Sequence, residues 1–299
     1  VHALCQTVNG WDALDGSVIS NRVALLYGSD QEYGFKLQHQ AEGMYYLEQL
    51  KLLHDGFTSI GVGVDIVDEK QDLSAYDIVL APNLLIDHPV VRQHLYQFVE
   101  RGGCLVLTAR CGVKDTYNKC IMEPLPTGYR ELAGITVKEY DPIGDRKQQL
   151  RLETTEWQQE WKSVQTRWNQ VSSQPVCRQW CELLEPCEEE VRVLARYDEA
   201  FYRDTAAVTE HTYGKGTCYY LGTILERQMY SVLARQTARR AGISYEPELP
   251  LGIEITTRSK GEMQWSFLFN NTEKEQRFYA RGKQWSLAPF EMRIDSQKG

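Results

Sequence analysis

The stretch YDIVLAPNLLIDHPVVRQHLYQFVERGGCLVLTARCG, residues 76–112, decides the fold of this chain. Two short apolar runs, at 78–81 and 104–107, flank an amphipathic segment that begins near Pro89 and ends before Gly102. Proline favours the first turn of a helix and glycine its end, and runs that are apolar on both faces are typical of buried parallel strands. The stretch therefore predicts a strand, a helix and a second strand parallel to the first.

The same alternation continues on both sides of this stretch. The run NRVALLYG at 21–28 is typical of a strand, and a helical stretch follows it up to Gly56. Further runs of strand length lie at 64–69 and 134–141. Strands that alternate with amphipathic helices predict a doubly wound α/β layer, in which helices cover both faces of a parallel sheet. The apolar positions that recur at helical spacing before Gly56 are Met44, Leu47, Leu50 and Leu53.

The second half of the chain changes character twice. Residues 144–189 form a polar, tryptophan-dotted stretch, which we interpret as an insertion into the α/β domain. A strand at 190–197, a hairpin around the turn YGKG and a helix at 226–242 then complete a domain that spans 19–247. From 248 to 299 there is no helical period, only short runs separated by turn residues. That pattern predicts a small antiparallel all-β domain.

The tryptophans of the insertion admit two interpretations. Aromatic faces stack on sugar rings, so these side chains could line a sugar site. Aromatic side chains also anchor contacts between domains or subunits, and the sequence does not distinguish the two roles. The residues are Trp157, Trp161, Trp168 and Trp180.

Composition excludes several classes of protein. The chain has 299 residues, of which 42% are hydrophobic, and a formal net charge of −8. No apolar run approaches the roughly eighteen residues of a membrane helix, and no basic stripe could displace counterions from a nucleic acid. Eight cysteines without a disulfide framework favour a reducing, cytoplasmic compartment. We expect no nucleic-acid partner, no membrane partner and no cofactor.

One cluster of cysteines is a candidate metal site. In CRQWCELLEPC, the residues Cys177, Cys181 and Cys187 are four and six residues apart, and no histidine stands among them. Structural zinc sites pair their cysteines at closer spacing and usually complete the set nearby. We therefore expect ordinary packing and no metal site at these positions.

Cys111 stands where class I amidotransferases and their relatives carry a nucleophile, just after a buried strand and before Gly112. A thiolate mechanism needs a general base, which is normally a histidine at the end of a late strand. The late run TCYYLGT ends at Thr223 without a histidine, and His211 lies in the hairpin, where an exposed side chain is expected. Cys111 is therefore expected to be a buried structural residue, with the nucleophile as the alternative.

Several segments together resemble the C-terminal part of glycoside hydrolase family 42 β-galactosidases. The similarity covers most of the chain, and the segments occur in the order and spacing of that family. Any one of them alone would indicate only a generic α/β layer. The segments lie at 73–86, 98–115, 129–141, 190–223 and 251–272.

The resemblance implies a domain plan. In this family a (β/α)8 barrel carries the chemistry, a class I glutamine amidotransferase-like, flavodoxin-like layer makes trimer contacts, and a small β domain follows. Residues 19–247 and 248–299 would be the second and third of these, and residues 1–18 would be the tail of a connection from the barrel. Because the chain begins with Val1, we expect it to be a processed or excised piece of a longer polypeptide.

The resemblance also implies what the chain does. The parent enzyme would hydrolyse terminal non-reducing β-D-galactose residues from β-galactosides, which bind to the barrel, and would assemble as a homotrimer through the α/β domain. Retaining glycosidases use a pair of carboxylates, and in the barrel enzymes the acid/base follows an asparagine. No Asn-Glu dipeptide occurs here, so no catalytic, cofactor-binding or metal residue is assigned and the chain alone is expected to be inactive.

Two alternatives remain, and one expectation concerns the assembly. The chain could be a stand-alone module that binds a carbohydrate or small ligand, or, less favoured, a cysteine hydrolase on an amidotransferase-like scaffold. In the trimer, we expect the strand-end loop from Arg110 to Asn118 and the helix that carries Met44 to lie close to the subunit interface.

Overall fold

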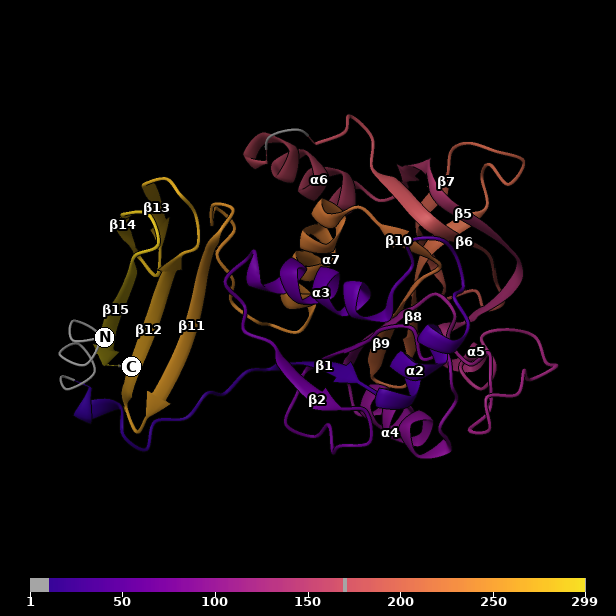
Figure 1. Ribbon diagram of the computed structural model, residues 1–299, viewed down its shortest axis with the longest axis horizontal. Helices are drawn as coiled ribbons and strands as arrows, with labels where there is room; N and C mark the ends of the chain where they lie inside the picture. The colour runs from indigo at the N-terminus through magenta and orange to yellow at the C-terminus, as the bar shows by residue number, and fades with distance from the viewer. Residues whose placement is uncertain (1–10, 169–170, 299) are drawn as a thin grey trace.

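The computed structural model describes residues 11–168 and 171–298 and has a mixed α/β architecture with a β-rich C-terminus. Figure 1 shows a large part, in which helices surround a sheet, and a small part made of the last strands. Within the described residues, no helix is long and apolar enough to cross a membrane.

A ten-stranded sheet forms the centre of the large part, and half of it is parallel. The parallel strands lie in the order β2-β1-β3-β4-β9, and each pairs in parallel with its neighbours. The stretch that decided the fold supplies two adjacent strands of this set, with Ile78 opposite Cys104. The strands are β1 (Val23–Tyr27), β2 (Asp65–Asp68), β3 (Ile78–Ala81), β4 (Cys104–Thr108) and β9 (Gly216–Leu221).

An antiparallel half extends the same sheet beyond β9. Its strands lie in the order β8-β7-β5-β6-β10, so the range 144–189 contributes the end of β5 and all of β6 to the main sheet. The remainder of that range includes helix α6 (Thr155–Arg167), which packs against α7 (Arg227–Arg240). The strands are β5 (Ile135–Leu152), β6 (Val176–Pro186), β7 (Arg192–Tyr197), β8 (Ala206–Tyr213) and β10 (Thr223–Leu225).

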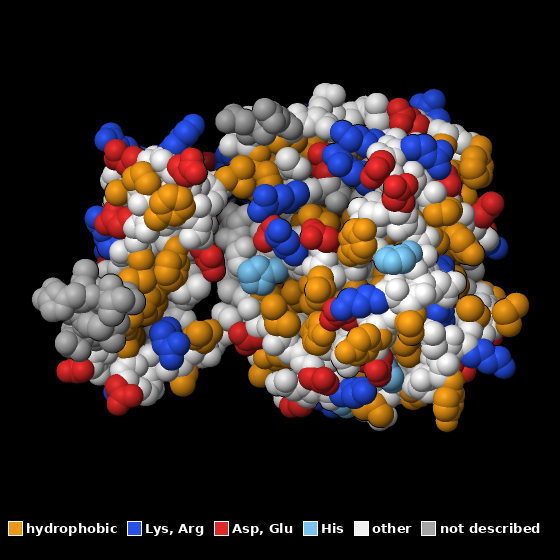
Figure 2. Space-filling model, viewed as in Figure 1, with side chains coloured by type: hydrophobic (Ala, Val, Ile, Leu, Met, Phe, Trp, Pro, Cys, Tyr) orange, Lys and Arg blue, Asp and Glu red, His pale blue; other side chains and the backbone are white. Residues whose placement is uncertain are grey.

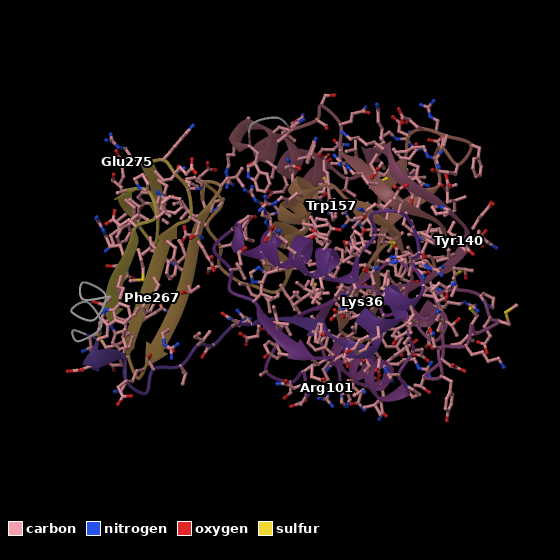
Figure 3. All side chains as sticks on the ribbon, viewed as in Figure 1. Lys36, Arg101, Tyr140, Trp157, Phe267 and Glu275 are labelled. Carbon is pink, nitrogen blue, oxygen red and sulfur yellow. The ribbon has the colours of Figure 1, made fainter. Side chains whose placement is uncertain are left out.

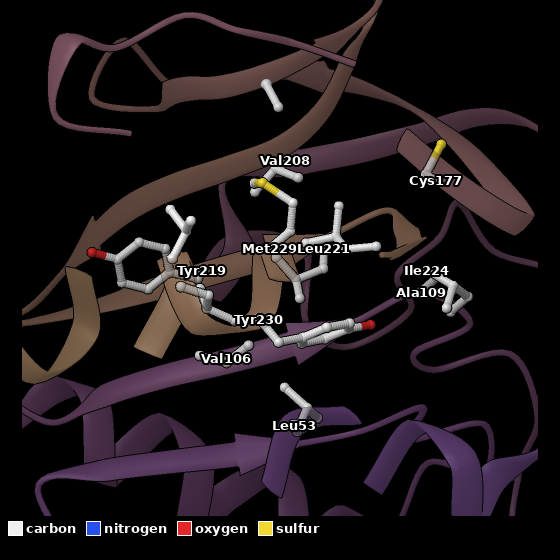
Figure 4. Close-up of a cluster of buried hydrophobic side chains, with 14 of the residues drawn as sticks. Leu53, Val106, Ala109, Cys177, Val208, Tyr219, Leu221, Ile224, Met229 and Tyr230 are labelled. Atoms are coloured by element: carbon white, nitrogen blue, oxygen red, sulfur yellow. The ribbon is translucent and has the colours of Figure 1, made fainter. Parts of the chain in front are cut away.

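Helices cover both faces of the parallel strands. Alternate residues of β1 enter separate cores: Leu25 packs in the core that contains Leu53 of α3 (Tyr46–Thr58), and Leu26 in the core that contains Leu95 of α4 (Pro89–Glu100). Each fully buried aliphatic side chain contributes about 1.5–3 kcal/mol of transfer free energy. Figure 4 shows part of the first core, including Leu53 and Tyr230 of α7.

A close helix crossing explains a glycine in this core. Gly56 of α3 faces α7, and a methyl group at Gly56 would lie 2.6 Å from the carbonyl oxygen of Tyr230. Because backbone cannot move aside as a flexible side chain can, only glycine allows α3 and α7 to approach so closely.

One helix boundary differs from the prediction. The stretch before Gly56 forms two helices, α2 (Ser29–Leu37) and α3, and Met44 lies in the turn before α3. Met44 is buried nevertheless, whereas Leu47, expected on the apolar face, is exposed. A glycine with positive φ, Gly43, ends the turn, so the helical period starts two residues later than the apolar pattern indicates.

The small part has its own core and packs on the start of the chain. Its sheet has the order β11-β12-β15, beside the hairpin β13-β14. Trp11 meets the ring of Phe267 edge-on at 6.1 Å, and Val18 bridges to Ser259. The remaining short elements are η1 (Asp12–Leu14) and α5 (Arg130–Ala133), and the strands are β11 (Ile253–Lys260), β12 (Met263–Asn270), β13 (Gln276–Ala280), β14 (Lys283–Leu287) and β15 (Met292–Lys298).

Candidate functional site at the carboxyl ends of the parallel strands

The turn after β4 is the position that the sequence singled out. Ligands of open α/β sheets bind outside the carboxyl ends of the strands, and this turn lies at that edge. The backbone makes its sharp change of direction at Arg110, whose φ is +68°, and Cys111 follows it. The residue presented by the turn is therefore an arginine and not the cysteine.

Cys111 is not placed to act as a nucleophile. Its side chain is 1% exposed, and burial raises the pKa of the thiol well above its usual value. The carboxylates of Asp87 and Glu182 oppose a thiolate further. Reactive cysteines need the opposite setting, an electropositive and accessible one. This confirms the structural interpretation of Cys111 and argues against the cysteine hydrolase.

The expected exposure of His211 is wrong. The ring is buried on β8, and its Nδ1 lies 3.0 Å from the carbonyl oxygen of Leu132 in α5. Gly134 packs directly against the ring. Because β8 is an interior strand of the long sheet, a polar residue in this hairpin is covered. The histidine is held by the α5 backbone, and among the described residues no hydrogen bond joins it to Cys111.

A buried carboxylate lies against the turn after β4. Glu182 of β6 is fully buried; its Oε1 accepts the Arg110 N–H at 2.9 Å and the indole N–H of Trp180 at 3.3 Å. Its Oε2 accepts the hydroxyl of Tyr220 at 2.8 Å. Burial raises the pKa of Glu182 above its usual value, although Arg110 pulls it down. The crevice is thus filled by a satisfied polar network.

An aromatic stack covers this carboxylate. The guanidinium of Arg110 lies 4.6 Å from the ring centre of Trp180 and 5.1 Å from that of Tyr140, and its Nε donates to Gln40 at 2.9 Å. The two rings are themselves stacked at 4.9 Å. Figure 3 shows Tyr140 at the end of the large part remote from Phe267. Such cation–π contacts hold the guanidinium in place over the two rings.

Sequence reasoning missed this network for a physical reason. Glu182 stands in the run CELLEP, where its neighbours are apolar, and both faces of β6 are covered. A lone carboxylate inside an apolar run was the available signal, because such a residue is seldom buried without partners. Its partner Tyr220 is 38 residues away, and the sequence alone does not reveal the pairing.

A second polar cluster lies at the ends of β1, β2 and β3. Glu69 is buried and accepts the Gln31 amide at 3.0 Å, and His88 Nε2 lies 3.1 Å from Asp30 and 3.4 Å from Glu69. Burial raises the pKa of Glu69. A methyl group at Gly28 would lie 2.4 Å from the Glu69 carboxylate, so the space beside the start of α2 is already occupied. This cluster fills the space between Gly28 and Glu69 beside the start of α2.

The cysteine cluster does not converge on one point. The sulfurs of Cys177 and Cys181 are buried and 3.9 Å apart, whereas Cys187 is exposed and contacts Thr136 at 3.2 Å. Over residues 11–168 and 171–298, no group of three or more His, Cys, Asp or Glu side chains is arranged to hold a metal ion.

The tryptophans of residues 144–189 do not form a sugar platform. All of them are buried in the core on the α3 and α7 side of the sheet. Trp157 and Trp161 lie on α6 and hold this helix against α7, and Trp180 stacks on Tyr140. The tryptophans therefore pack inside the α/β part itself, which is neither the sugar site nor the contact between domains or subunits that the sequence suggested.

Labelling should distinguish the thiols directly. We expect iodoacetamide to modify the exposed Cys120 and Cys187 in the folded protein, and Cys111 only after unfolding, because burial keeps its thiol protonated and inaccessible. Peptide mass mapping before and after addition of urea measures this. Alkylation of Cys111 in the folded protein as fast as that of Cys120 would contradict the structural role.

The chain is similar in sequence to known proteins over most of its length. A family model described as the beta-galactosidase trimerisation domain matches residues 21–244. The beta-galactosidase BgaA of Clostridium cellulovorans is 36% identical over 97% of this chain and 43% of its own length. BglY of Alicyclobacillus acidocaldarius is 30% identical over 77% of this chain and 32% of its own. The chain thus spans less than half the length of these relatives.

Solved structures agree on the fold. The beta-galactosidase from Rahnella sp. R3 superposes with a TM-score of 0.86 over 98% of this chain and 43% of its own, at 22% identity. The enzyme from Bacillus circulans gives a TM-score of 0.82 over 96% and 43%, at 21% identity. The family match and the relatives confirm the resemblance in the sequence: the chain belongs to the beta-galactosidase trimerisation domain family of glycoside hydrolase family 42.

Proposed function

We propose that this chain is the non-catalytic assembly region of a homotrimeric β-galactosidase, whose upstream (β/α)8 barrel binds β-galactosides and releases terminal non-reducing β-D-galactose. The observation that carries the proposal is the family match over residues 21–244 in a chain that covers only 43% of BgaA. The filled crevice at Glu182 supports a role without chemistry of its own. No residue of this chain is assigned to catalysis, to a cofactor or to a metal.

The proposal includes the division of the chain. Residues 19–247 form the amidotransferase-like domain, with 144–189 inserted in it, residues 248–299 form the β domain, and residues 1–18 lead from the barrel. The parallel strand order β2-β1-β3-β4-β9 supports a flavodoxin-like layer, because that class has the order 2-1-3-4-5. The seven described cysteines are free, which supports a cytoplasmic enzyme.

Activity and mass together test the proposal. We expect the isolated chain to leave nitrophenyl-β-galactoside intact, because its sequence has no Asn-Glu dipeptide to supply the acid/base of the barrel enzymes, and we expect the full-length polypeptide to hydrolyse it as a trimer. Initial-rate assays and light scattering across a concentration series measure both. Turnover by the isolated chain that is lost on mutating one of its own glutamates would overturn the assignment, as would a full-length enzyme that stays monomeric.

A further inference from the structure

The face formed by α2 and α3 carries an apolar hollow. Its volume is about 290 Å³, and Phe35, Met44 and Tyr46 form part of its wall. Figure 2 shows hydrophobic side chains gathered on this face, around the position of Lys36 in Figure 3. Contiguous exposed apolar patches mark interaction surfaces. The large apolar side chains exposed on α2, on α3 and in the turn before α3 are Tyr33, Leu37, Tyr45 and Leu47.

A second exposed apolar feature is the loop at 114–123, which we name the knob loop. Tyr117 is 90% exposed and Met122 92% exposed. The loop has a defined shape, because Asp115 Oδ1 accepts the backbone N–H groups of Tyr117 and Lys119, each at 2.9 Å. A loop held in this way presents its aromatic side chain without an ordering cost on binding, as interface anchors do.

These two features refine the expected location of the interface. Arg110 is buried in its aromatic stack and is not available to a partner, whereas the buried Met44 contributes only to the wall of the hollow. The exposed part of the strand-end loop is the knob loop, and the exposed part of the helical region is the rim of the hollow. Both lie on the α/β domain, which gives the family its description as a trimerisation domain.

We propose that the knob loop of one copy inserts Tyr117 and Met122 into the α2–α3 hollow of the next copy. This inference rests on the trimer in the proposed function and names the surfaces that make it. The hollow, at about 290 Å³, is at the lower end of the size of pockets that enclose a bound group, which suits one or two side chains. Two different surfaces meet, so the contact is heterologous, as a closed trimer requires.

The orientation of the two surfaces is compatible with closure. In Figure 1 the loop between β4 and α5 projects from the edge of the domain beyond α5, while α2 and α3 lie on the face towards the viewer. A heterologous contact between opposite faces would extend into an open filament, whereas surfaces set at an angle allow the rotation that a closed ring needs.

Charge at the two surfaces is complementary. Lys119 is exposed on the knob loop, and Glu48 is exposed at the edge of the hollow. Among the ion pairs of the described part of the chain, neither residue has a partner within its own subunit. Seating the knob loop in the hollow would pair them across the interface, which fixes the register of the contact. A second copy of this chain is therefore the occupant that both surfaces fit.

Apolar substitutions test the contact in the full-length polypeptide. We expect Tyr117→Ser on the knob side and Leu47→Glu on the hollow side each to weaken association at least about thirtyfold, the size of a hot-spot loss. Tyr279→Ser, which alters an exposed tyrosine on β13, is the matched control and should leave the trimer unchanged. Sedimentation velocity measures the mass, and circular dichroism confirms that each variant is folded.

Exchanging the two charges tests the register of the contact and leaves the hydrophobic core unchanged. Lys119→Glu and Glu48→Lys should each weaken the trimer, and the double variant should restore it, while Lys215→Glu on the β8–β9 turn should have no effect. A trimer that persists in every variant overturns this inference and leaves the proposed function standing. If the variants destabilise the barrel but leave the trimer intact, the upstream region fills the hollow, and this result also overturns the inference. A wild-type enzyme that never trimerises removes the proposed function itself.

Discussion

Replacing Arg235 by alanine should lower the free energy of unfolding by about 3–5 kcal/mol, the cost of breaking a buried ion pair by removing one partner. Arg235 lies on α7 with 1% of its side chain exposed. Its guanidinium donates to Glu160 at 2.9 Å, to Ser163 at 3.1 Å and to the carbonyl oxygen of Pro247 at 2.8 Å. The substitution leaves a cavity and removes a donor from Glu160 Oε2, Ser163 Oγ and the Pro247 carbonyl oxygen, while Glu160 Oε1 keeps its bond from Arg239.

Urea denaturation monitored by circular dichroism measures the loss. Arg277→Ala is the matched control, because its ion pair with Glu275 is exposed and such pairs contribute less than about 1 kcal/mol. Arg239 also forms an ion pair with Glu160, but it is not buried as Arg235 is. Arg239→Ala should therefore lower the free energy of unfolding much less than Arg235→Ala. Equal losses for the two arginines would show that burial of Arg235 is not what makes it important.

Glu160 adds a pH signature to this prediction. Burial alone would raise the pKa of Glu160, but hydrogen bonds from Arg239 and Arg235 hold this pKa below its usual value. The ionised form therefore stabilises the fold above the unfolded pKa, and this contribution is lost as pH falls through the folded pKa. Arg235→Ala removes part of it, so the stability difference between wild type and variant should shrink in acid.

The strands and helices of the parallel half could be predicted because burial there is simple. Runs such as 78–81 and 104–107 are covered on both faces, so their apolar character is continuous and marks them directly. Pro89 starts α4 at the predicted place, since its fixed φ suits the first turn. A local sequence pattern is enough to predict an element when the burial of each residue depends only on its position in that element.

The antiparallel half depends on contacts that no local pattern contains. Residues 144–189 are polar and carry several tryptophans, so the sequence marks them as an insertion; in the fold, their strand β6 pairs with β5 and with β10 in the main sheet. His211 and Glu182 are polar yet buried, because distant backbone and side-chain partners satisfy them. Such pairings span tens of residues, and only the folded arrangement identifies them.

The network around Glu182 also joins the two halves of the sheet. In this chain the turn after β4 presents Arg110, and the turn fastens β4 to β6 through the carboxylate of Glu182. The parallel half is thereby joined to the antiparallel half at the edge where a substrate would otherwise bind. Rigidity at this edge also fixes the start of the knob loop, which leaves β4 only a few residues later.

Glu182→Ala should therefore be as damaging as any substitution in the chain, with an expected loss of about 3–5 kcal/mol in the free energy of unfolding. Leaving a buried donor unsatisfied costs about 1–3 kcal/mol, and three donors lose their acceptor here. Urea denaturation measures the loss, and Glu185→Ala, which alters an exposed glutamate of the same strand, is the control. A loss no larger than that of the control would contradict the role of the network.

Glu182→Gln separates the charge of this group from its hydrogen bonds. Burial raises the folded pKa of Glu182 above the unfolded value, so the folded state retains a proton that the unfolded state releases, and wild-type stability falls as pH rises between the two values. Glutamine does not titrate. The stability of wild type relative to Glu182→Gln should therefore increase as the pH is lowered from about 8 to about 5. Urea denaturation of both proteins at each pH measures the difference in their free energies of unfolding. The protonation of distant groups affects both proteins equally and cancels in this difference. A difference that stays constant over this range would mean that Glu182 is ionised in the fold with an ordinary pKa, and that the Arg110 guanidinium outweighs burial.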